Sequence, residues 1–444
     1  MISNSLHIIV GLGETGLSCA RFLASRGIPF AVADTREKPP HINELMQIDP
    51  QVKTSFGPLN SAFFKEATCI LLSPGISVKT EVIAELYARG LEVIGDIELF
   101  ARVVDVPVIA ITGTNAKSTV TTLVGLMMKE GGYVTKVGGN LGVPALDLLQ
   151  PDTEVYVLEL SSFQLETTNT LKPAIATVLN ITPDHLDRYD TVNDYALAKH
   201  RIYQNCHIAV CNRDDKHTDC QNVEVTRKSY FTVSEPKSGE FGLTKHLNTT
   251  YLSYGDERLM PVNELPVSGK HHQANALAAL AIGHGFGISF EPMLKVLREF
   301  PGLPHRCQMI RELNGVCWIN DSKGTNVGAT LAAIEGLGSD MTGKLVMIMG
   351  GVGKNADFSD LVPVIKRYAR HVVLIGAAAP ELSLIFAPVV SVSMAETLAL
   401  AVHEASQIAL PHDYVLLSPA CASLDMFKNY EHRGQVFTEL VTKL

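Results

Sequence analysis

Short apolar runs rich in Val, Ile and Leu recur along this chain of 444 residues. Runs that are apolar throughout are typical of strands buried on both faces of a parallel sheet. Helical patterns separate several runs, and this alternation predicts an α/β fold with right-handed crossovers. The expected strands are His7–Val10, Cys69–Leu72, Val106–Ile111, Val155–Leu160, Ile175–Leu179, Ile208–Val210, Leu345–Met349, Val372–Ile375 and Tyr414–Leu417. The clearest helical patterns cover Glu14–Ser25, Lys117–Glu130, Asn275–His284 and Asp360–Ala369.

Two shifts in composition divide the chain into parts of domain size, since a domain takes roughly 150 residues. One lies near Gly95, just before a helix and the strand Val106–Ile111, and the other is the Pro/Gly-rich stretch Phe300–Pro304. We therefore expect three domains, at residues 1–95, 96–301 and 302–444. The polar, Thr/Ser-rich segment Asp215–Pro266 predicts a small β-rich part of the central domain.

The overall charge excludes one broad class of partner. The formal net charge is −9, and such a field would repel a phosphate backbone, so we expect no nucleic acid partner. A few local basic residues would still suffice for a small anionic substrate. The N-terminus lacks the features of a signal peptide, and no apolar run approaches the roughly 20 residues that span a bilayer. We expect a cytoplasmic protein without membrane insertion.

The eight cysteines include no CxxC pair. Cys206, Cys211 and Cys220 lie near His207 and His217, but their spacing fits no zinc pattern. We therefore expect the reduced thiols of a cytosolic protein rather than a metal site.

The first motif is GLGETG (Gly11–Gly16), directly after the strand His7–Val10. Such glycines let the backbone turn tightly and approach a diphosphate at a helix N-terminus. Asp34 follows where a ribose-binding acid is often found. The pattern by itself favours dinucleotide binding, although a tight turn without a ligand gives the same pattern.

The second motif is GTNAKST (Gly113–Thr119), which follows the strand Val106–Ile111 and opens a helical pattern. Main-chain N–H groups there could cradle phosphates, Lys117 could reach the outer phosphates, and Ser118 could hold magnesium. The strict P-loop pattern has glycine where this chain has Ile111 and Ala116. An ordinary strand-to-helix turn is therefore the alternative.

Polar residues also follow two further strands of the expected central domain. Glu159 closes the strand Val155–Leu160, and His185 comes soon after the strand that ends at Asn180. A carboxylate beside a P-loop strand is the usual place for a magnesium ligand. The plainer alternatives are helix capping for Ser161 and Ser162, surface charge for Asp187 and Arg188, and a solvated helix face for Lys199.

A fourth group of polar residues lies beyond Phe300. Several strand ends there carry Lys, Thr and Ser, and they predict a pocket for a small carboxylate at the carboxyl edge of a sheet. Each lysine alone is more often a surface residue than a ligand, but the group together favours a pocket. The segments are Pro304–Arg306, Asn320–Asn326, Gly350–Lys354 and Ser418–Asp425.

Together these segments resemble the Mur ligases, in all three expected domains and in the family's order. The resemblance is closest to the members that add D-glutamate. It rests on GTNAKST (Gly113–Thr119), GGNLG (Gly138–Gly142), ELSSFQLE (Glu159–Glu166), DHLDRY (Asp184–Tyr189), GLPHR (Gly302–Arg306), NDSKGTN (Asn320–Asn326) and LLSPACASLDMFKNYEHRG (Leu416–Gly434).

The resemblance implies a Rossmann-like first domain that binds a uridine diphosphate, a central P-loop ATPase domain and a Rossmann-like C-terminal domain. The implied contacts with the nucleotide sugar are Glu14, Thr15, Asp34, Arg36, Ser73 and Gly75, with Asn140 on the muramoyl part. The implied ATP contacts are Gly113, Thr114, Asn115, Ala116, Lys117, Ser118, Thr119, Asn275, Arg306 and Asp321. The implied D-glutamate contacts are Lys323, Thr325, Lys354, Ser423 and Leu424.

The resemblance also implies two magnesium ions. One would lie on Ser118 and Glu159, and the other on His185 and Lys199, with Lys199 carbamylated by CO₂. Lys117, His185 and Lys199 are then the implied catalytic residues.

The implied reaction is ATP-dependent attachment of D-glutamate to UDP-N-acetylmuramoyl-L-alanine through an acyl phosphate, with release of ADP and phosphate. This reaction belongs to peptidoglycan precursor synthesis, and hence to cell-wall growth, cell shape and division. We expect a monomer whose domains close to keep water from the acyl phosphate.

Four positions depart from the family's usual pattern. Ala116 replaces the customary glycine of the P-loop and should fit only if its φ angle is negative. Val352 stands where an acid is common, Tyr430 where Phe is common, and His272 where an Asn near the nucleotide is expected.

Three rival functions follow from the same residues. An NAD-dependent oxidoreductase would explain the GLGETG motif and Asp34, but it leaves the second phosphate loop and the third domain without a role. A non-catalytic nucleotide switch would show no phosphate release that depends on an amino acid. A sibling ligase would add another amino acid, although the arginine-bearing pocket used for diaminopimelate is absent from this sequence.

Overall fold

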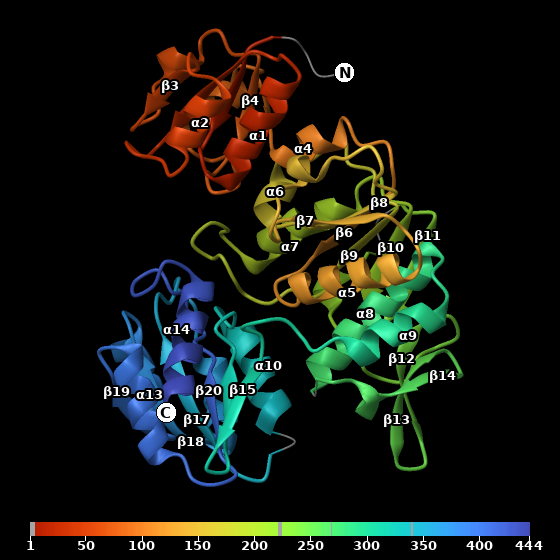
Figure 1. Ribbon diagram of the computed structural model, residues 1–444, viewed down its shortest axis with the longest axis vertical. Helices are drawn as coiled ribbons and strands as arrows, with labels where there is room; N and C mark the ends of the chain where they lie inside the picture. Colours follow the sequence, from red (N-terminus) through yellow and green to blue (C-terminus); the bar gives the residue numbers. More distant parts are fainter. Residues whose placement is uncertain (1–4, 221–223, 268, 339–340) are drawn as a thin grey trace.

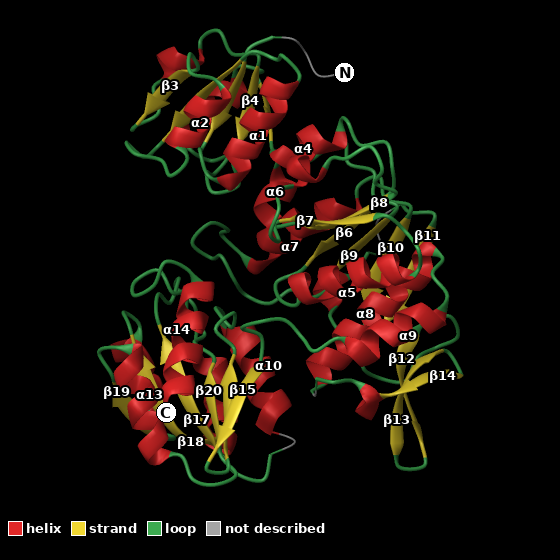
Figure 2. Cartoon of the chain, viewed as in Figure 1, coloured by secondary structure: helices red, strands yellow, loops and turns green. Residues whose placement is uncertain are grey.

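The computed structural model describes residues 5–220, 224–267, 269–338 and 341–444, and in these residues the strands form three separate sheets (Figures 1 and 2). The first sheet is wholly parallel, with the order β3-β2-β1-β4-β5. Its strands are β1 (His7–Val10), β2 (Phe30–Asp34), β3 (Lys53–Phe56), β4 (Cys69–Leu72) and β5 (Glu92–Ile94). The accompanying helices are α1 (Glu14–Ser25), α2 (Ile42–Ile48) and α3 (Glu81–Ala88).

The second sheet has the order β14-β13-β12-β11-β10-β9-β6-β8-β7 and belongs to the central part of the chain. It is parallel from β12 to β7, while β12, β13 and β14 form an antiparallel meander. The strands are β6 (Val108–Thr112), β7 (Thr135–Gly139), β8 (Val155–Glu159), β9 (Ile175–Val178), β10 (Ile208–Asn212), β11 (Arg227–Phe231), β12 (Phe241–His246), β13 (Thr249–Tyr254) and β14 (Glu257–Pro261). The helices are α5 (Lys117–Glu130), α6 (Ser162–Glu166), α7 (Val192–His200), α8 (Lys270–Phe286) and α9 (Phe290–Glu299).

The third sheet has the order β15-β16-β20-β17-β18-β19, with one antiparallel pair at its β15 edge. Its strands are β15 (Gln308–Leu313), β16 (Val316–Asn320), β17 (Leu345–Gly350), β18 (Ala369–Ile375), β19 (Ser391–Met394) and β20 (Tyr414–Leu417). The helices are α10 (Val327–Gly338), α11 (Val362–Tyr368), α12 (Ala379–Phe386), α13 (Leu398–Ile408) and α14 (Tyr430–Lys443). The predicted three-domain α/β fold is thus confirmed.

Every strand expected from an apolar run overlaps an observed strand. The helices expected over Glu14–Ser25 and Lys117–Glu130 have those bounds, because each begins directly after a phosphate-type loop. Helix α8 begins five residues before the expected Asn275, at Lys270. Helix α11 is shorter than expected, since Pro363 fits only its first turn and Ala369 already belongs to β18. Within the polar segment Asp215–Pro266, the described residues between 227 and 261 form β11 to β14, so this part is β-rich as expected.

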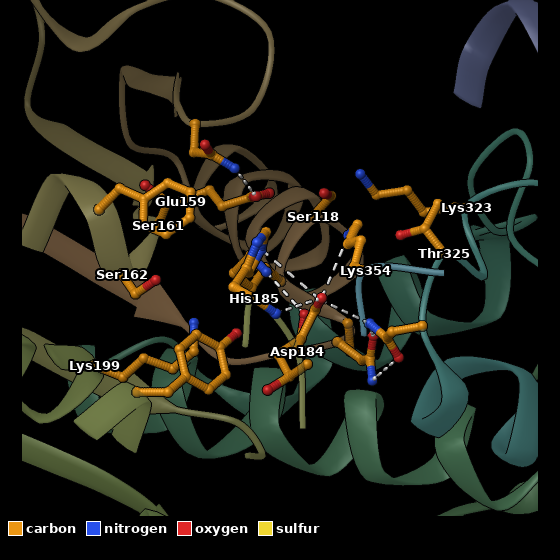
Figure 3. A pocket seen from close by; sticks show the side chains of 18 of the residues that line it. Ser118, Glu159, Ser161, Ser162, Asp184, His185, Lys199, Lys323, Thr325 and Lys354 are labelled. Atoms are coloured by element: carbon orange, nitrogen blue, oxygen red, sulfur yellow. Dashed lines mark hydrogen bonds and ion pairs between the residues drawn. The ribbon is translucent and has the colours of Figure 1, made fainter. Parts of the chain in front are cut away.

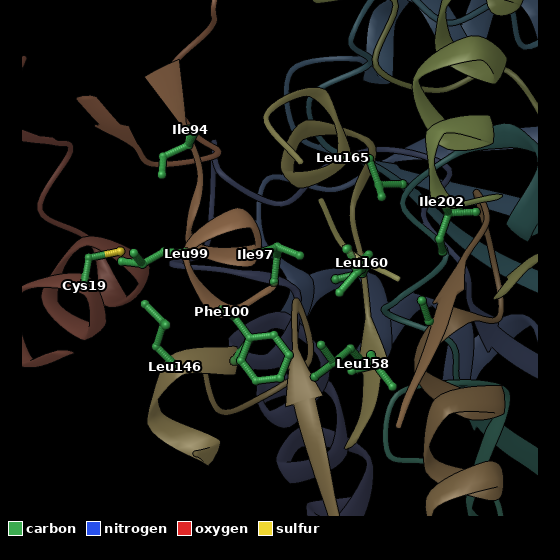
Figure 4. Close-up of a cluster of buried hydrophobic side chains, with 14 of the residues drawn as sticks. Cys19, Ile94, Ile97, Leu99, Phe100, Leu146, Leu158, Leu160, Leu165 and Ile202 are labelled. Atoms are coloured by element: carbon green, nitrogen blue, oxygen red, sulfur yellow. The ribbon is translucent and has the colours of Figure 1, made fainter. Parts of the chain in front are cut away.

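The first and central domains share one hydrophobic core. Helix α4 (Asp96–Ala101) lies between them, and its Ile97, Leu99 and Phe100 are wholly buried. Figure 4 shows these side chains between Cys19 of the first domain and Leu158 of the central sheet. The apolar cores of the C-terminal domain are separate clusters. The first two domains are therefore packed as one body, while the third meets them without a common core.

The cysteines differ in part from expectation. Cys211 at β10 and Cys220 form a disulfide, so the expectation that these two thiols are reduced is wrong for this structure. The two residues are only nine apart in sequence, and the loop between them returns Cys220 to the end of β10. Cys206 is a free, buried thiol.

Within the described ranges no helix is both long and apolar enough to pass through a lipid bilayer.

Candidate active site

The glycine-rich loop of the first domain joins β1 to α1. Gly11 has a φ of +98°, and a Cβ on Gly16 would lie 1.9 Å from the Gly11 carbonyl oxygen, so neither position accepts a side chain. Gly13 instead faces open space. The loop thus leaves one main-chain surface bare at the start of α1, where a diphosphate could approach.

Asp34 at the end of β2 holds this loop in place. Its Oδ2 accepts a hydrogen bond from the Leu12 N–H at 2.6 Å, and both carboxylate oxygens accept from Arg36. Burial alone would raise the pKa of Asp34, but these hydrogen bonds lower it overall. Ser73 Oγ donates to the Gly11 carbonyl oxygen at 2.7 Å. The predicted residues Asp34, Arg36 and Ser73 therefore meet at one edge of the first sheet.

The phosphate loop of the central domain lies between β6 and α5. Lys117 Nζ donates to the carbonyl oxygens of Gly113 and Thr114, both at 2.9 Å, so the ammonium group packs against the main chain of the loop. Ala116 has φ 66° and ψ −5°, a left-handed conformation. The expectation of a negative φ at Ala116 is therefore wrong. The loop has a backbone conformation that glycine adopts easily, and in alanine this conformation is strained.

Glu159 at the end of β8 is buried next to this loop. Its Oε1 accepts a hydrogen bond from Asn140 Nδ2 at 2.8 Å, whereas its Oε2 has no partner among the described residues. A buried carboxylate oxygen without a donor is costly unless a cation or proton meets it.

Ser161 and Gln164 form a capping box at α6, so helix capping accounts for Ser161, which is the plainer of the two alternatives given above.

Lys199 on α7 is almost wholly buried, which excludes a solvated helix face. Its Nζ donates to the Gly113 carbonyl oxygen at 2.9 Å and lies 4.5 Å from the centroid of the Tyr195 ring. Burial, reinforced by the charge of Lys117, lowers the pKa of Lys199 well below its usual range. A neutral amine is therefore accessible at this position.

His185 and Asp184 lie in the loop between β9 and α7, at the centre of the cavity shown in Figure 3. His185 has a left-handed backbone, with φ 56°. Burial lowers the pKa of the His185 imidazole. Burial would raise the pKa of Asp184, but the charges of His185 and Lys354 lower it overall.

The C-terminal domain contributes the opposite wall of this cavity of about 290 Å³, with Lys323, Thr325 and Lys354 (Figure 3). Lys354 Nζ lies 3.4 Å from Asp184 Oδ1, across the domain boundary. Lys323 Nζ lies 3.8 Å from the centroid of the Tyr430 ring. Tyr430, which stands where the family commonly has Phe, thus still presents an aromatic ring to Lys323. Burial, followed by the charge of Lys117, lowers the pKa of Lys323 to about 8.

A second cavity adjoins the first and brings together the predicted nucleotide contacts Asn275, Arg306 and Asp321. Burial raises the pKa of Asp321 to about 6. His271 and His272 also line this cavity, and burial lowers their pKa values to about 4 and about 3. Both imidazoles are therefore neutral near pH 7 and present uncharged rings to a ligand.

Two predicted D-glutamate contacts lie apart from these cavities. Ser423 is buried, and Leu424 has an exposed fraction of 72%. Neither residue lines the first cavity or the one next to it, which contains Lys354 and Thr325.

Sequence reasoning missed Asn326, which links two domains. Its Nδ2 lies 3.1 Å from Asn115 Oδ1 and 3.1 Å from Asp184 Oδ2. The residue was present in the NDSKGTN segment, but an asparagine after Thr gives no local signal that it contacts a loop more than 200 positions earlier.

Models of three known domains match the chain in order. The Mur ligase MurD-like N-terminal domain matches residues 5–95, the Mur ligase middle domain matches residues 111–283, and the Mur ligase glutamate ligase domain matches residues 305–421.

Curated relatives extend this similarity over the whole chain. The UDP-N-acetylmuramoylalanine--D-glutamate ligase of Pseudomonas putida is 52% identical, over 98% of this chain and 97% of that protein. The enzyme of the same name from Coxiella burnetii is 49% identical over 100% of both chains. Among solved structures, the UDP-N-acetylmuramate-alanine ligase of Thermotoga maritima covers 99% of both chains with a TM-score of 0.62 at 17% identity, which supports the fold alone.

Fold and site together define a three-domain, ATP-dependent ligase. The chain belongs to the Mur ligase family, whose domains it carries in full order and whose members ligate peptidoglycan precursors.

Proposed function

We propose that this enzyme joins D-glutamate to UDP-N-acetylmuramoyl-L-alanine at the expense of ATP, with release of ADP and phosphate. One observation carries the proposal. The phosphate loop, the unpaired oxygen of Glu159 and three side chains suited to a small carboxylate all line one cavity. Relatives at 49–52% identity are named for this reaction.

The chemistry requires activation, because a carboxylate is a poor electrophile. Transfer of the γ-phosphoryl group breaks the bond from the γ-phosphorus to its bridging oxygen, forms a P–O bond to the alanine carboxylate and releases ADP. The D-glutamate amine then attacks the acyl carbon, loses a proton, and phosphate leaves as the amide forms. Lys117 would balance charge on the transferring group, and Lys354 with Thr325 would hold D-glutamate by its carboxylates.

Ser118, Glu159, His185 and Lys199 would hold two magnesium ions. The unpaired Glu159 Oε2 supports a cation at this place. No three His, Cys, Asp or Glu side chains in the described part of the chain gather closely enough to hold a metal alone, so Ser118, a modified lysine and the substrate's phosphates would have to complete the sites. Bound magnesium would neutralise phosphate charge.

Lys199 would supply its ligand as a carbamate. Its neutral amine would attack the carbon of CO₂, form an N–C bond and lose a proton, leaving an anionic oxygen donor. The buried position and lowered pKa of Lys199 support this step, because an ammonium group has no lone pair to react.

The remaining assignments rest on the same cavities. ATP would lie along Gly113–Thr119 with its nucleoside near Asn275, Arg306 and Asp321, and the nucleotide sugar would run from the first domain to Asn140. Ser423 and Leu424 would reach D-glutamate only after the C-terminal domain moves. The division at residues 1–95, 96–301 and 302–444, a monomeric state and a cytoplasmic location complete the proposal.

The deciding experiment is phosphate release with UDP-N-acetylmuramoyl-L-alanine and ATP across a panel of amino acids. We expect release with D-glutamate and not with L-glutamate, L-lysine or diaminopimelate. Equal or greater release with another amino acid would reassign the enzyme to a sibling reaction. NADH formation from NAD without phosphate release would support the oxidoreductase instead.

A further inference from the structure

Arg188 joins the central domain to the first domain through a main-chain carbonyl group. Its Nη1 donates to the Pro74 carbonyl oxygen at 2.8 Å, and its Nη2 donates to Glu166 Oε2 at 2.6 Å. The Arg188 and Glu166 side chains are only 13% and 15% exposed, so solvent screens the pair weakly. Pro74 lies between Ser73 and Gly75, two predicted contacts of the nucleotide sugar.

The same arginine is tied to His185 in two ways. The His185 carbonyl oxygen accepts hydrogen bonds from the N–H groups of Arg188 at 2.9 Å and Tyr189 at 3.0 Å. Both side chains also pack on Phe163: the Arg188 guanidinium carbon lies 4.0 Å from the ring centroid, and the His185 ring lies 4.8 Å away, edge to face. His185 has a left-handed backbone, and its ring also packs edge to face on Tyr195, so the contacts with Arg188 and Phe163 are part of what positions the imidazole.

Arg188 is one of several contacts between the first and central domains. They already share the core around α4 (Figure 4). A second ion pair joins the same loop to the first domain, Lys79 Nζ to Asp190 Oδ2 at 3.1 Å, but its side chains are 65% and 82% exposed. Exposed pairs of this kind contribute little. Lys79 therefore offers a matched comparison for Arg188: the same loop and the same two domains, without the burial or the contact with Phe163.

We propose that Arg188 is a positioning residue. It couples the nucleotide-sugar site of the first domain, at Ser73 and Gly75, to the orientation of the His185 imidazole in the reaction centre. A ligand on Ser73 and Gly75 fixes the Pro74 carbonyl group, which fixes the guanidinium group, which in turn fixes Phe163 and the turn at His185. This inference rests on the proposed function, since it takes the UDP-linked muramoyl substrate as the ligand of the first domain.

The test uses the full-length protein and its variant Arg188→Met, which keeps most of the apolar stem. Hydrogen exchange of peptides covering residues 183–191 is followed by mass spectrometry with and without saturating UDP-N-acetylmuramoyl-L-alanine, beside calorimetric affinity and steady-state kinetics. In the unaltered enzyme the nucleotide sugar should slow exchange at least threefold. In Arg188→Met the slowing should vanish and kcat should fall at least tenfold, while affinity for the nucleotide sugar stays within threefold. Lys79→Met should match the unaltered enzyme throughout.

Several results would overturn the inference. Slowed exchange in Arg188→Met as in the unaltered enzyme would show that no coupling passes through this side chain. A loss of affinity as large as the loss in kcat would make Arg188 a direct ligand rather than a positioning residue. If Arg188→Met does not fold, Arg188→Gln takes its place, because the shorter glutamine cannot bridge Pro74 and Glu166, and unchanged slowing and kcat there count equally against the inference. An unaltered enzyme that binds no nucleotide sugar would refute the proposed function itself.

Discussion

Ala116 keeps a left-handed backbone at the entrance of α5, where an L-residue is strained by about 1–2 kcal/mol. Ala116 lines both of the adjoining cavities of the site. The turn thus has a backbone that suits glycine best although alanine occupies it, because the flanking strand and helix fix both ends of the turn.

Replacing Ala116 by Gly should raise the free energy of unfolding by about 0.5–1 kcal/mol, because the relief of strain exceeds the added entropy of the unfolded chain. Urea unfolding measures the change. Ala329→Gly, inside α10, should instead lower stability by about 1 kcal/mol. A destabilised Ala116→Gly would show that the loop is not strained.

Lys199→Arg should be inactive, because arginine keeps a positive charge and cannot be carbamylated at neutral pH. Lys199→Ala should also be nearly inactive, and a short carboxylic acid added to the buffer should restore part of its activity. Phosphate release measures both variants, and intact-protein mass shows that each is otherwise unmodified. Full activity of Lys199→Arg would exclude the carbamate.

Lys354→Ala should raise the KM for D-glutamate at least tenfold while the affinity for ATP changes less than threefold. A carboxylate that loses a partly buried cationic partner forfeits on the order of 2–5 kcal/mol, and Lys354 is the cation that the C-terminal domain holds next to Asp184. Steady-state kinetics with each substrate varied in turn measures both constants. An unchanged KM for D-glutamate would remove Lys354 from the amino-acid site.

At the scale of elements, the Asn326 side chain connects the start of α10 to the phosphate loop. Asn326 Oδ1 accepts a hydrogen bond from the Ala329 N–H at 2.8 Å, while its Nδ2 donates to Asn115 and Asp184. One amide thus caps a helix of the C-terminal domain and contacts two loops of the central domain. It therefore links the start of α10 to the phosphate loop and to the loop that carries Asp184.

Asn326→Ala and Asn326→Ser separate these two tasks. Serine can still cap α10 but does not reach Asn115, so both variants should lose at least tenfold in kcat, while only the alanine variant should lose about 1 kcal/mol of stability. Steady-state kinetics and urea unfolding provide the two measurements. Full activity of Asn326→Ser would show that the contact with the phosphate loop is dispensable.

At the scale of the whole molecule, the apolar cores group the first and central domains together and leave the C-terminal domain separate. The first and central domains share a core around α4, whereas the C-terminal domain has cores of its own and meets the central domain at the site through polar contacts such as Lys354 with Asp184. Polar contacts of this kind re-form in water at little cost, so we expect any opening of the site to be a movement of the C-terminal domain.

The whole protein should bind UDP-linked sugar and not NAD, despite its GLGETG motif. The carboxylate of Asp34 already accepts hydrogen bonds from Leu12 and Arg36, so it is poorly placed to take two ribose hydroxyl groups as well. Isothermal titration with UDP-N-acetylmuramoyl-L-alanine and with NAD decides between them. Tight binding of NAD without a response to the UDP-linked sugar would overturn the prediction.

The sequence by itself determined the fold class, the bounds of α1 and α5, and the loops that bear Lys117, Glu159 and His185. Apolar periodicity and residues at strand ends are local signals, and parallel sheets bring carboxyl ends to one edge. Only the tertiary structure decided the backbone of Ala116, the disulfide between Cys211 and Cys220, the burial of Lys199, and the contacts of Asn326 and Arg188 across domains. Each of these depends on where segments distant in sequence come to lie, and that placement is set by the packing of whole sheets and helices rather than by any local pattern.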